Sequence, residues 1–289
     1  MKFITRCFDK IKTQFRESAS YRNKQTINGK KVIKNAVNIE YSNFPVGAPL
    51  NIGDTLSPTI YEYLKAKYGL VEKKHKKTIH LNMIGSIIGF KSYDATIWGS
   101  GVLQEDFEDR IKYRSKFVKY DIRAVRGPLT REVLLRCGYD CPKVYGDPAI
   151  LLPLVYTPNK ITKHYGVSVV RHYNDKTIIP NEFHEISVVT DDYKNFVDEI
   201  CASELVISSS LHGLIIAETY GIPTIWFNPN GQDDFKYRDW YLSIGVENPA
   251  KIHSISEISN RKNVGLEKKI SNLIEPLLQS FPFEFWSKQ

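Results

Sequence analysis

The hydrophobic and polar positions of segment 205–227 predict a β-α-β unit. The segment begins with the apolar run Leu205–Ile207, passes through three serines and His212, and continues as a short apolar stretch. A Gly221-Ile-Pro223 break then precedes a second apolar run, Thr224–Phe227. Because short apolar runs bounded by turn residues are typical of buried parallel strands, the polar residues fall where the first strand meets the helix.

That junction is a natural place for an anion. In open α/β sheets, ligands collect at the carboxyl ends of the strands, and a helix N-terminus offers N–H groups and a positive dipole end. His212 therefore stands where an acid would face a bound phosphate or carboxylate. A single histidine in an apolar setting is more often a core residue, so the position alone leaves both interpretations open.

The same alternation of strand and helix runs through both halves of the chain. Short apolar runs predict strands, and apolar residues at helical spacing followed by glycine predict helices. In the first half we expect a helix over 59–68 and strands over 78–84, 93–98 and 122–126. In the second half we expect strands over 165–170 and 185–189, helices over 193–202 and 266–278, and an aromatic tail over 281–286.

We therefore expect an α/β protein with two Rossmann-like lobes and an active-site cleft between them. Residues 31–160 would form the N-terminal lobe, and residues 161–289 the C-terminal lobe with its final helix and aromatic tail. The length of 289 residues suits two domains of about 130–150 residues each.

Residues 1–30 differ in character from the rest of the chain. Phe3, Ile4, Phe8 and Ile11 recur at helical spacing, with lysines and arginines between them. This pattern predicts a basic amphipathic helix, which lies on an anionic membrane surface or packs against protein.

Composition narrows the class of protein. The net charge of +8 indicates an anionic partner. The sequence lacks zinc-finger, helix-turn-helix and aromatic RNA-binding patterns, which favours phosphorylated small molecules or anionic lipids over nucleic acid. The four cysteines include no Cys-x-x-Cys pair, which indicates a reducing compartment. We expect a cytoplasmic protein, because the sequence has no apolar run of about 18 residues and no secretory-signal pattern.

Further polar residues fall at predicted strand ends or loop starts and would face the same cleft. Taken singly, each has an ordinary structural explanation: Asp54 suits a helix N-cap, and Arg126 suits a surface ion pair. Their shared position makes the set stronger than its members. The set comprises Asp54, Gly99-Ser100-Gly101, Arg126, Arg171, His172, Ser208, Ser209, Ser210, His212, Lys236 and Arg238.

Dinucleotide and metal sites are not expected. The loop Gly99-Ser100-Gly101 lacks the third glycine of the dinucleotide fingerprint, because Gln104 occupies that position. The pairs Asp191-Asp192 and Asp233-Asp234 lack flanking ligands and suit solvated turns and caps.

A series of short motifs, in this order along the chain, resembles the polysaccharide pyruvyl transferases. The similarity is to short bacterial members that decorate exopolysaccharide or capsule, and it covers roughly Val37 to Gly245. The motifs are Asn51-Ile-Gly-Asp54, Trp98-Gly-Ser-Gly101, Ala124–Arg131, Tyr145-Gly-Asp-Pro148, Ser208–Gly213, Gly221-Ile-Pro223 and Phe235-Lys-Tyr-Arg-Asp239.

The resemblance implies two lobes similar to those of GT-B glycosyltransferases. It also implies phosphoenolpyruvate as the donor substrate, no cofactor, and an acceptor sugar with two free hydroxyls. The product would be a cyclic pyruvate ketal, with release of phosphate. Such acceptors usually sit on an undecaprenyl lipid, which would bring the protein to the inner face of the cytoplasmic membrane as a peripheral protein.

The chemistry of this donor suggests roles for the candidate residues. Its phosphate and carboxylate need cations, for which we expect Arg126, Lys236 and Arg238. Protonation of its methylene carbon needs an acid, which we expect to be His212, while Asp54 would orient or deprotonate the attacking hydroxyl. The other donor-binding candidates are Arg171, His172, the glycine loop 99–101, and the backbone N–H groups between Ser209 and Gly213, which would stabilise the leaving phosphate.

One position departs from the family pattern. Many members carry an arginine two residues before the motif histidine, where this chain has Ser210. Arg171, Lys236 or Arg238 would then supply the missing charge. A GT-B glycosyltransferase using a nucleotide sugar and a non-catalytic scaffold in a glycan-assembly complex remain the alternatives.

Overall fold

The computed structural model describes residues 26–27, 30–41, 51–159, 162–229, 231, 234–258 and 262–288. Nearly all of the segment in which we expected a basic amphipathic helix lies outside these residues. No helix within the described ranges is long and apolar enough to cross a membrane.

The N-terminal part of the chain builds a four-stranded parallel sheet in the order β3-β5-β6-β7. Parallel strands require crossover connections, and helices supply several of them. The strands are β3 (Val37–Glu40), β5 (Ile79–Asn82), β6 (Ala95–Trp98) and β7 (Tyr120–Ala124), and the helices are α2 (Ile52–Tyr68), α3 (Phe107–Arg114) and α4 (Pro128–Arg136).

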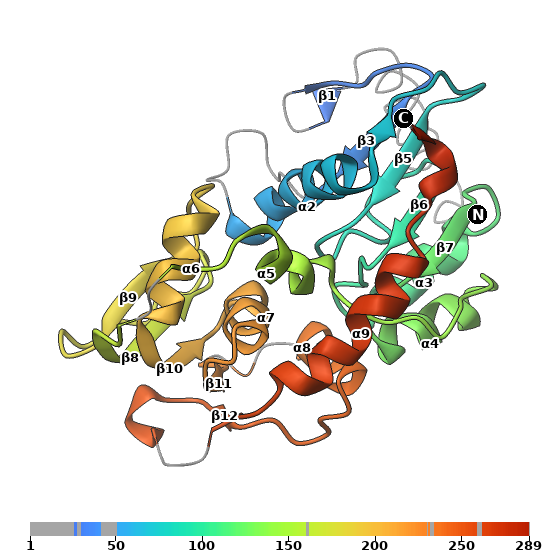
Figure 1. The fold of residues 1–289 in the computed structure, drawn as a ribbon. Coiled ribbons are helices and arrows are strands. Elements are labelled where there is room, and N and C mark those ends of the chain that lie inside the picture. The colour runs from blue at the N-terminus through green and yellow to red at the C-terminus, as the bar shows by residue number, and fades with distance from the viewer. Residues whose placement is uncertain are drawn as a thin grey trace, which may run out of the picture.

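The C-terminal part builds a five-stranded parallel sheet in the order β12-β11-β10-β8-β9. Its strands are β8 (Tyr165–Arg171), β9 (His184–Ser187), β10 (Ser203–Ser208), β11 (Thr224–Phe227) and β12 (Lys251–Ile252). Its helices are α6 (Tyr193–Cys201), α7 (Leu211–Thr219), α8 (Phe235–Ser243) and α9 (Glu267–Gln279). The expected α/β protein with parallel sheets is confirmed, and Figure 1 shows the two sheets lying in different parts of the molecule.

Short elements connect and complete these two sheets. A 3₁₀ turn, Pro148–Leu151, runs into α5 (Leu152–Val155), and further 3₁₀ turns span Ile255–Glu257 and Phe283–Phe285. Two small antiparallel pairs join β1 (Thr26–Ile27) to β2 (Lys30–Lys31) and β4 (Leu70–Val71) to β13 (Ser287–Lys288).

Helix α2 begins earlier than the sequence predicted. The Asn51 side chain caps it by accepting a hydrogen bond of 3.0 Å from the Gly53 N–H, so the first turn includes Asp54. Pro58 lies inside the helix, where its nitrogen cannot donate to the Asp54 carbonyl. The helix ends at Gly69, whose φ of 58° is the left-handed conformation typical of a C-terminal cap.

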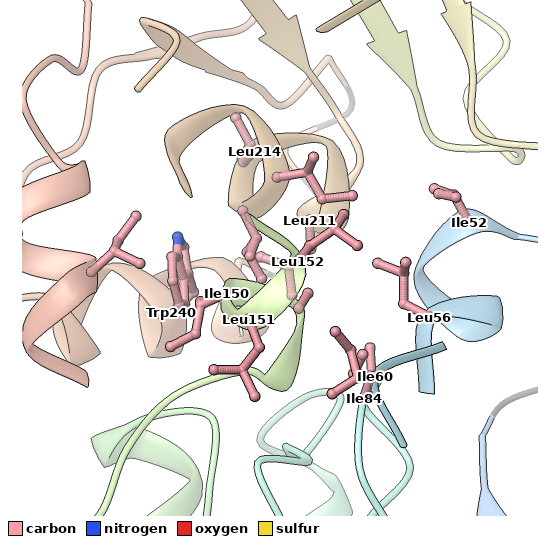
Figure 2. Packing of buried hydrophobic residues seen from close by; sticks show 14 of the residues in the cluster. Ile52, Leu56, Ile60, Ile84, Ile150, Leu151, Leu152, Leu211, Leu214 and Trp240 are labelled. Atoms are coloured by element: carbon pink, nitrogen blue, oxygen red, sulfur yellow. The ribbon is translucent and has the colours of Figure 1, made fainter. Parts of the chain in front are cut away.

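The largest of the three clusters of buried side chains among the described residues takes members from both sheets and from the helices between them. Many of its members come from α2, the Pro148–Leu151 turn, α7 and α8, as Figure 2 shows. Because these elements belong to both halves, their apolar contacts hold the two sheets in one arrangement. The labelled side chains are Ile52, Leu56, Ile60, Ile84, Ile150, Leu151, Leu152, Leu211, Leu214 and Trp240.

The C-terminal segment, which we expected to belong to the C-terminal lobe, contacts α7 of that part and also reaches the N-terminal sheet and α2. Helix α9 runs along the molecule toward β6 (Figure 1), and the Trp98 indole N–H donates to the Leu277 carbonyl at 2.9 Å. In the aromatic tail, the Trp286 indole N–H donates to the Tyr61 hydroxyl of α2 at 3.1 Å. The tail therefore ties the end of the chain to α2.

Candidate functional site

A cavity of about 280 Å³ opens at the carboxyl ends of both sheets. Segments that follow β3, β5, β8 and β10 line it, together with the starts of α2, α7 and α8. This is where an open parallel sheet binds ligands. Five of the side chains expected from the sequence line the cavity: Asp54, His172, Ser210, His212 and Lys236.

His212 lies in the first turn of α7, between α2 and the Pro148–Leu151 turn. Its Nε2 lies 3.6 Å from Asp147 Oδ2, and both atoms are buried without a hydrogen-bond partner among the described residues. The other Asp147 oxygen accepts from the Ala149 N–H at 3.0 Å, which fixes the carboxylate. On the opposite side, a Cβ on Gly53 would lie 1.9 Å from His212 Nδ1, so only a glycine leaves room for the ring.

Asp147 was not among the candidates, although the sequence offered a signal for it. It belongs to the Tyr145-Gly-Asp-Pro148 motif, and it sits at the start of a 3₁₀ turn. A buried carboxylate beside a histidine orients the ring. We therefore treat Asp147 as the positioning partner of His212.

Asp54 has the electrostatics of a group that changes its protonation state near neutral pH. Burial raises its pKa to about 6, against the lowering effects of His212 and Lys236. Removing a carboxylate from water disfavours its charge, whereas nearby cations favour it. Such a pKa suits an acid or base that works near neutral pH.

His172 and Lys236 face the same part of the cavity. Burial and, to a smaller extent, the charge of Lys236 lower the pKa of His172 to about 4. The backbone N–H of His172 donates to Ser209 Oγ at 3.0 Å, and that hydroxyl donates to Asp175 at 2.6 Å. Ser209 therefore holds the loop after β8 in place, and it is not among the residues that line the cavity.

Ser210, which departs from the expected family pattern, caps α7. Its hydroxyl accepts from the Gly213 N–H at 3.5 Å. The backbone N–H groups of Ser209 and Ser210 donate to the Val170 carbonyl at 3.1 Å and to Ser208 Oγ at 3.0 Å. These two N–H groups, and that of Gly213, are engaged within the protein, so the expectation that they bind phosphate needs correction.

Arg126 also has a different place from the one expected. Its side chain is fully buried, and its Nε donates to Asp239 Oδ2 at 3.0 Å. The remaining guanidinium nitrogens donate to Ser86 Oγ at 2.6 Å and to the Val102 carbonyl at 2.7 Å. Arg126 therefore joins the segment after β7 to α8 and positions Ser86, which does line the cavity. It does not reach a ligand there.

Two further arginines lie away from the cavity wall. Arg171 forms an ion pair with Glu185 and donates to the Asp175 and Thr177 carbonyls. Arg238 is exposed on α8, with a guanidinium nitrogen 3.9 Å from Asp234. Neither belongs to the lining, so neither replaces the family arginine directly.

The glycine loop 99–101 has a packing role. Gly99 has a φ of +89°, and a Cβ there would lie 2.3 Å from the Pro148 ring. The Ser100 hydroxyl donates to the Gly85 carbonyl at 2.7 Å. A Cβ on Gly101 would lie 2.3 Å from Arg126 Cζ, so this glycine makes room for the buried guanidinium. The loop packs against Pro148 and Arg126 and does not line the cavity.

Another part of the cavity wall was missed by the sequence analysis. Glu40, Asn82, Lys91 and Tyr93 line it, at the ends of β3 and β5 and in the following loop. These residues match no motif, and nothing in the sequence of their strands and loop distinguishes them as site residues. Among the described residues, no group of three or more His, Cys, Asp or Glu side chains is arranged to hold a metal ion.

Two proteins of similar sequence help to identify the family of this chain. One curated relative is an uncharacterised protein of Acanthamoeba polyphaga mimivirus, 29% identical over 182 residues that cover 58% of this chain and 61% of that protein. Another is the succinoglycan biosynthesis protein ExoV of Rhizobium meliloti (strain 1021), 28% identical over 135 residues that cover 44% of this chain and 42% of that protein. The matched region thus spans less than two thirds of either relative.

One solved structure has a similar fold, and its similarity to this chain concerns the fold alone. The crystal structure of a functionally uncharacterised protein from Klebsiella pneumoniae subsp. pneumoniae NTUH-K2044 aligns with a TM-score of 0.51 and 14% sequence identity. The alignment covers 83% of this chain and 98% of that one. At the level of sequence, the polysaccharide pyruvyl transferase family matches residues 53–231, a span that contains the cavity residues from Asp54 to His212. The chain therefore belongs to the polysaccharide pyruvyl transferase family.

Proposed function

We propose that this protein transfers the pyruvyl group of phosphoenolpyruvate to two hydroxyls of one sugar in a surface-polysaccharide repeat unit. The product is a cyclic ketal, and inorganic phosphate is released. The observation that carries the proposal is the convergence of Asp54, His212 and Lys236 on one cavity in a chain of this family. The same proposal includes three further features: a two-lobed arrangement similar to that of GT-B enzymes, an undecaprenyl-linked acceptor, and a peripheral position at the inner face of the membrane.

The first step is proton transfer to carbon. His212 gives a proton to the methylene carbon of phosphoenolpyruvate, which leaves cation character at C2. The Asp147 carboxylate, 3.6 Å from His212 Nε2, faces the ring and helps to orient it. Lys236 attracts the phosphate or the carboxylate of the donor.

The second step is attack by the acceptor. One sugar hydroxyl adds to C2 and gives its proton to Asp54, whose pKa of about 6 lets it accept a proton near neutral pH. A second hydroxyl of the same sugar then attacks C2 and displaces phosphate. Of the two hydroxyl protons, one replaces that given to the methyl carbon, and the other leaves with the phosphate.

Thermal denaturation tests the donor assignment first. Phosphoenolpyruvate should raise the Tm, whereas UDP-glucose and other nucleotide sugars should not, because only a ligand of the native state stabilises it. A shift with nucleotide sugars alone would favour a glycosyltransferase. No effect of any cavity substitution on the glycan made would instead favour a scaffold.

Turnover tests the acid. Purified protein, phosphoenolpyruvate and a lipid-linked oligosaccharide should release phosphate and add a pyruvyl group detectable by mass spectrometry. His212→Ala should lower kcat by about 10²–10⁴-fold. His164→Ala is the matched control, because His164 is exposed and does not line the cavity. Full activity of His212→Ala would contradict the assignment.

A further inference from the structure

The part of the cavity missed by the sequence analysis has a defined geometry. Strands β3 and β5 are parallel neighbours, and Glu40 pairs in register with Asn82 at their carboxyl ends. Side chains in register on adjacent strands lie on the same face of a sheet. Both side chains line the cavity, and the two residues are only 2% and 4% exposed.

Glu40 is held firmly in this position. One of its carboxylate oxygens lies 2.6 Å from His80 Nδ1. The His80 ring in turn stacks on Tyr93, with centroids 3.9 Å apart and an interplanar angle of 24°. The carboxylate and the aromatic ring of Tyr93 are therefore fixed to each other through a buried histidine.

Asn82 points to the kind of ligand. Its side-chain oxygen is buried and has no hydrogen-bond partner among the described residues. Leaving such an acceptor unpaired costs free energy, which a ligand that donates a hydrogen bond offsets. Sugar hydroxyls donate hydrogen bonds, whereas an ionised phosphate or carboxylate of phosphoenolpyruvate has no donor to offer.

The charged side chains in this part of the cavity differ from those around His212. Lys236 acts electrostatically on Asp54 and on His172. Lys91 instead has Glu40 as its charged neighbour, and burial lowers the pKa of its ammonium group. The opposite charges of Lys91 and Glu40 offset each other, so this region does not favour a charged ligand.

We propose that Glu40, Asn82, Lys91 and Tyr93 form the acceptor subsite, and that it selects an uncharged hexose. The sugar hydroxyls donate to Glu40 and Asn82 and accept from Lys91, and one face of the sugar ring packs against Tyr93. The name acceptor rests on the proposed function; the binding of an uncharged sugar at this place does not. The bound sugar then presents two further hydroxyls toward Asp54.

Ligand-observed NMR tests the subsite without knowledge of the natural acceptor. The probes are methyl β-D-glucopyranoside and methyl β-D-galactopyranoside, with methyl β-D-glucuronoside as the charged comparison. Wild-type protein should bind at least one of the neutral glycosides, and should bind it more tightly than the glucuronoside. Asn82→Leu and Glu40→Gln should each weaken this binding by about tenfold, the loss expected for one or two polar contacts.

Matched controls separate this effect from misfolding. Asn272→Leu makes the same chemical change at an exposed position on α9 and should bind the glycoside like wild type. The Tm shift produced by phosphoenolpyruvate should be the same in Asn82→Leu and in wild type, which shows that the folded cavity is intact.

Several results would overturn the subsite. They are wild-type affinity in both cavity variants, a preference for the glucuronoside, no binding of either neutral glycoside, or displacement of the glycoside by phosphoenolpyruvate. The proposed function fails separately. If wild-type protein binds the neutral glycoside but shows no Tm shift with phosphoenolpyruvate, the subsite proposal stands and the assignment of phosphoenolpyruvate as donor fails.

Discussion

Asp54 is buried in a form that costs folding free energy at neutral pH, so Asp54→Asn should stabilise the protein while it removes activity. Burial raises the Asp54 pKa from 3.8 to about 6. A shift of this size corresponds to about 3 kcal/mol, at about 1.4 kcal/mol for each pH unit. Asparagine keeps the shape and lacks the charge, so the variant avoids this cost.

The size of the effect depends on pH. A carboxyl whose pKa is raised on folding binds protons more tightly in the folded protein. Its stabilising protonation is complete below the unfolded value of 3.8 and is lost as the pH rises through about 6. Roughly half of the 3 kcal/mol cost has developed by pH 5, and nearly all of it by pH 7.5. The advantage of Asp54→Asn over wild type should therefore grow by about 1–1.5 kcal/mol between these two pH values.

Urea unfolding near pH 5 and near pH 7.5 measures this difference as a change in midpoint at constant slope. Asp140→Asn is the control, because it makes the same chemical change at an exposed residue outside the cavity. In turnover assays, the wild-type rate should rise with pH through about 6 as the Asp54 carboxyl loses its proton. Asp54→Asn should lower kcat by about 10²-fold or more and lose this pH dependence. An advantage that does not grow with pH, or a variant less stable than wild type at pH 7.5, would refute the reasoning.

Three further substitutions test other contacts. Gly53→Ala should displace the His212 ring and lower kcat by about tenfold or more, whereas Gly166→Ala, with open space around it, should not; equal rates in steady-state assays would contradict this. Arg126→Met should cost about 3–5 kcal/mol in urea unfolding because it leaves the buried Asp239 charge unpaired, and the half-exposed Arg123→Met should cost much less. Glu218, whose pKa is raised to about 7 by burial, should make wild-type stability fall as the pH rises from 6 to 8, and Glu218→Gln should flatten that profile.

The sequence predicted those elements whose local signals agree with their tertiary surroundings. The predicted strand 93–98 and helix 193–202 correspond to β6 (Ala95–Trp98) and α6 (Tyr193–Cys201). The start of α2 was missed because Pro58 looks like a helix boundary, while the Asn51 cap extends the helix ahead of it. Helix α8 was missed because its aromatic residues alternate with charged ones and are buried on several sides by distant segments.

The candidate site could be predicted only in part for a related reason. Sequence position indicates that a side chain lies at a strand end, and this was enough to predict that Asp54 and His212 face the cavity. It does not indicate whether a cation meets a ligand or another part of the protein. Arg126 is paired with Asp239, which lies 113 residues away in the chain. Glu40 and Lys91 become neighbours only when β3 and β5 pair, which no local pattern reveals.

Ser210 affects how the proposed donor would be held. Of the four cations expected to bind it (Arg126, Arg171, Lys236 and Arg238), Lys236 alone lines the cavity. A guanidinium grips a phosphate or carboxylate by two parallel hydrogen bonds and so fixes its orientation, whereas an ammonium group acts as a point charge. Because Ser210 caps α7 and carries no charge, the proposed donor would be oriented by His172, His212 and the cavity wall. Lys236 would then supply attraction, and the geometry of the proposed proton transfer would depend on the Gly53, His212 and Asp147 contacts.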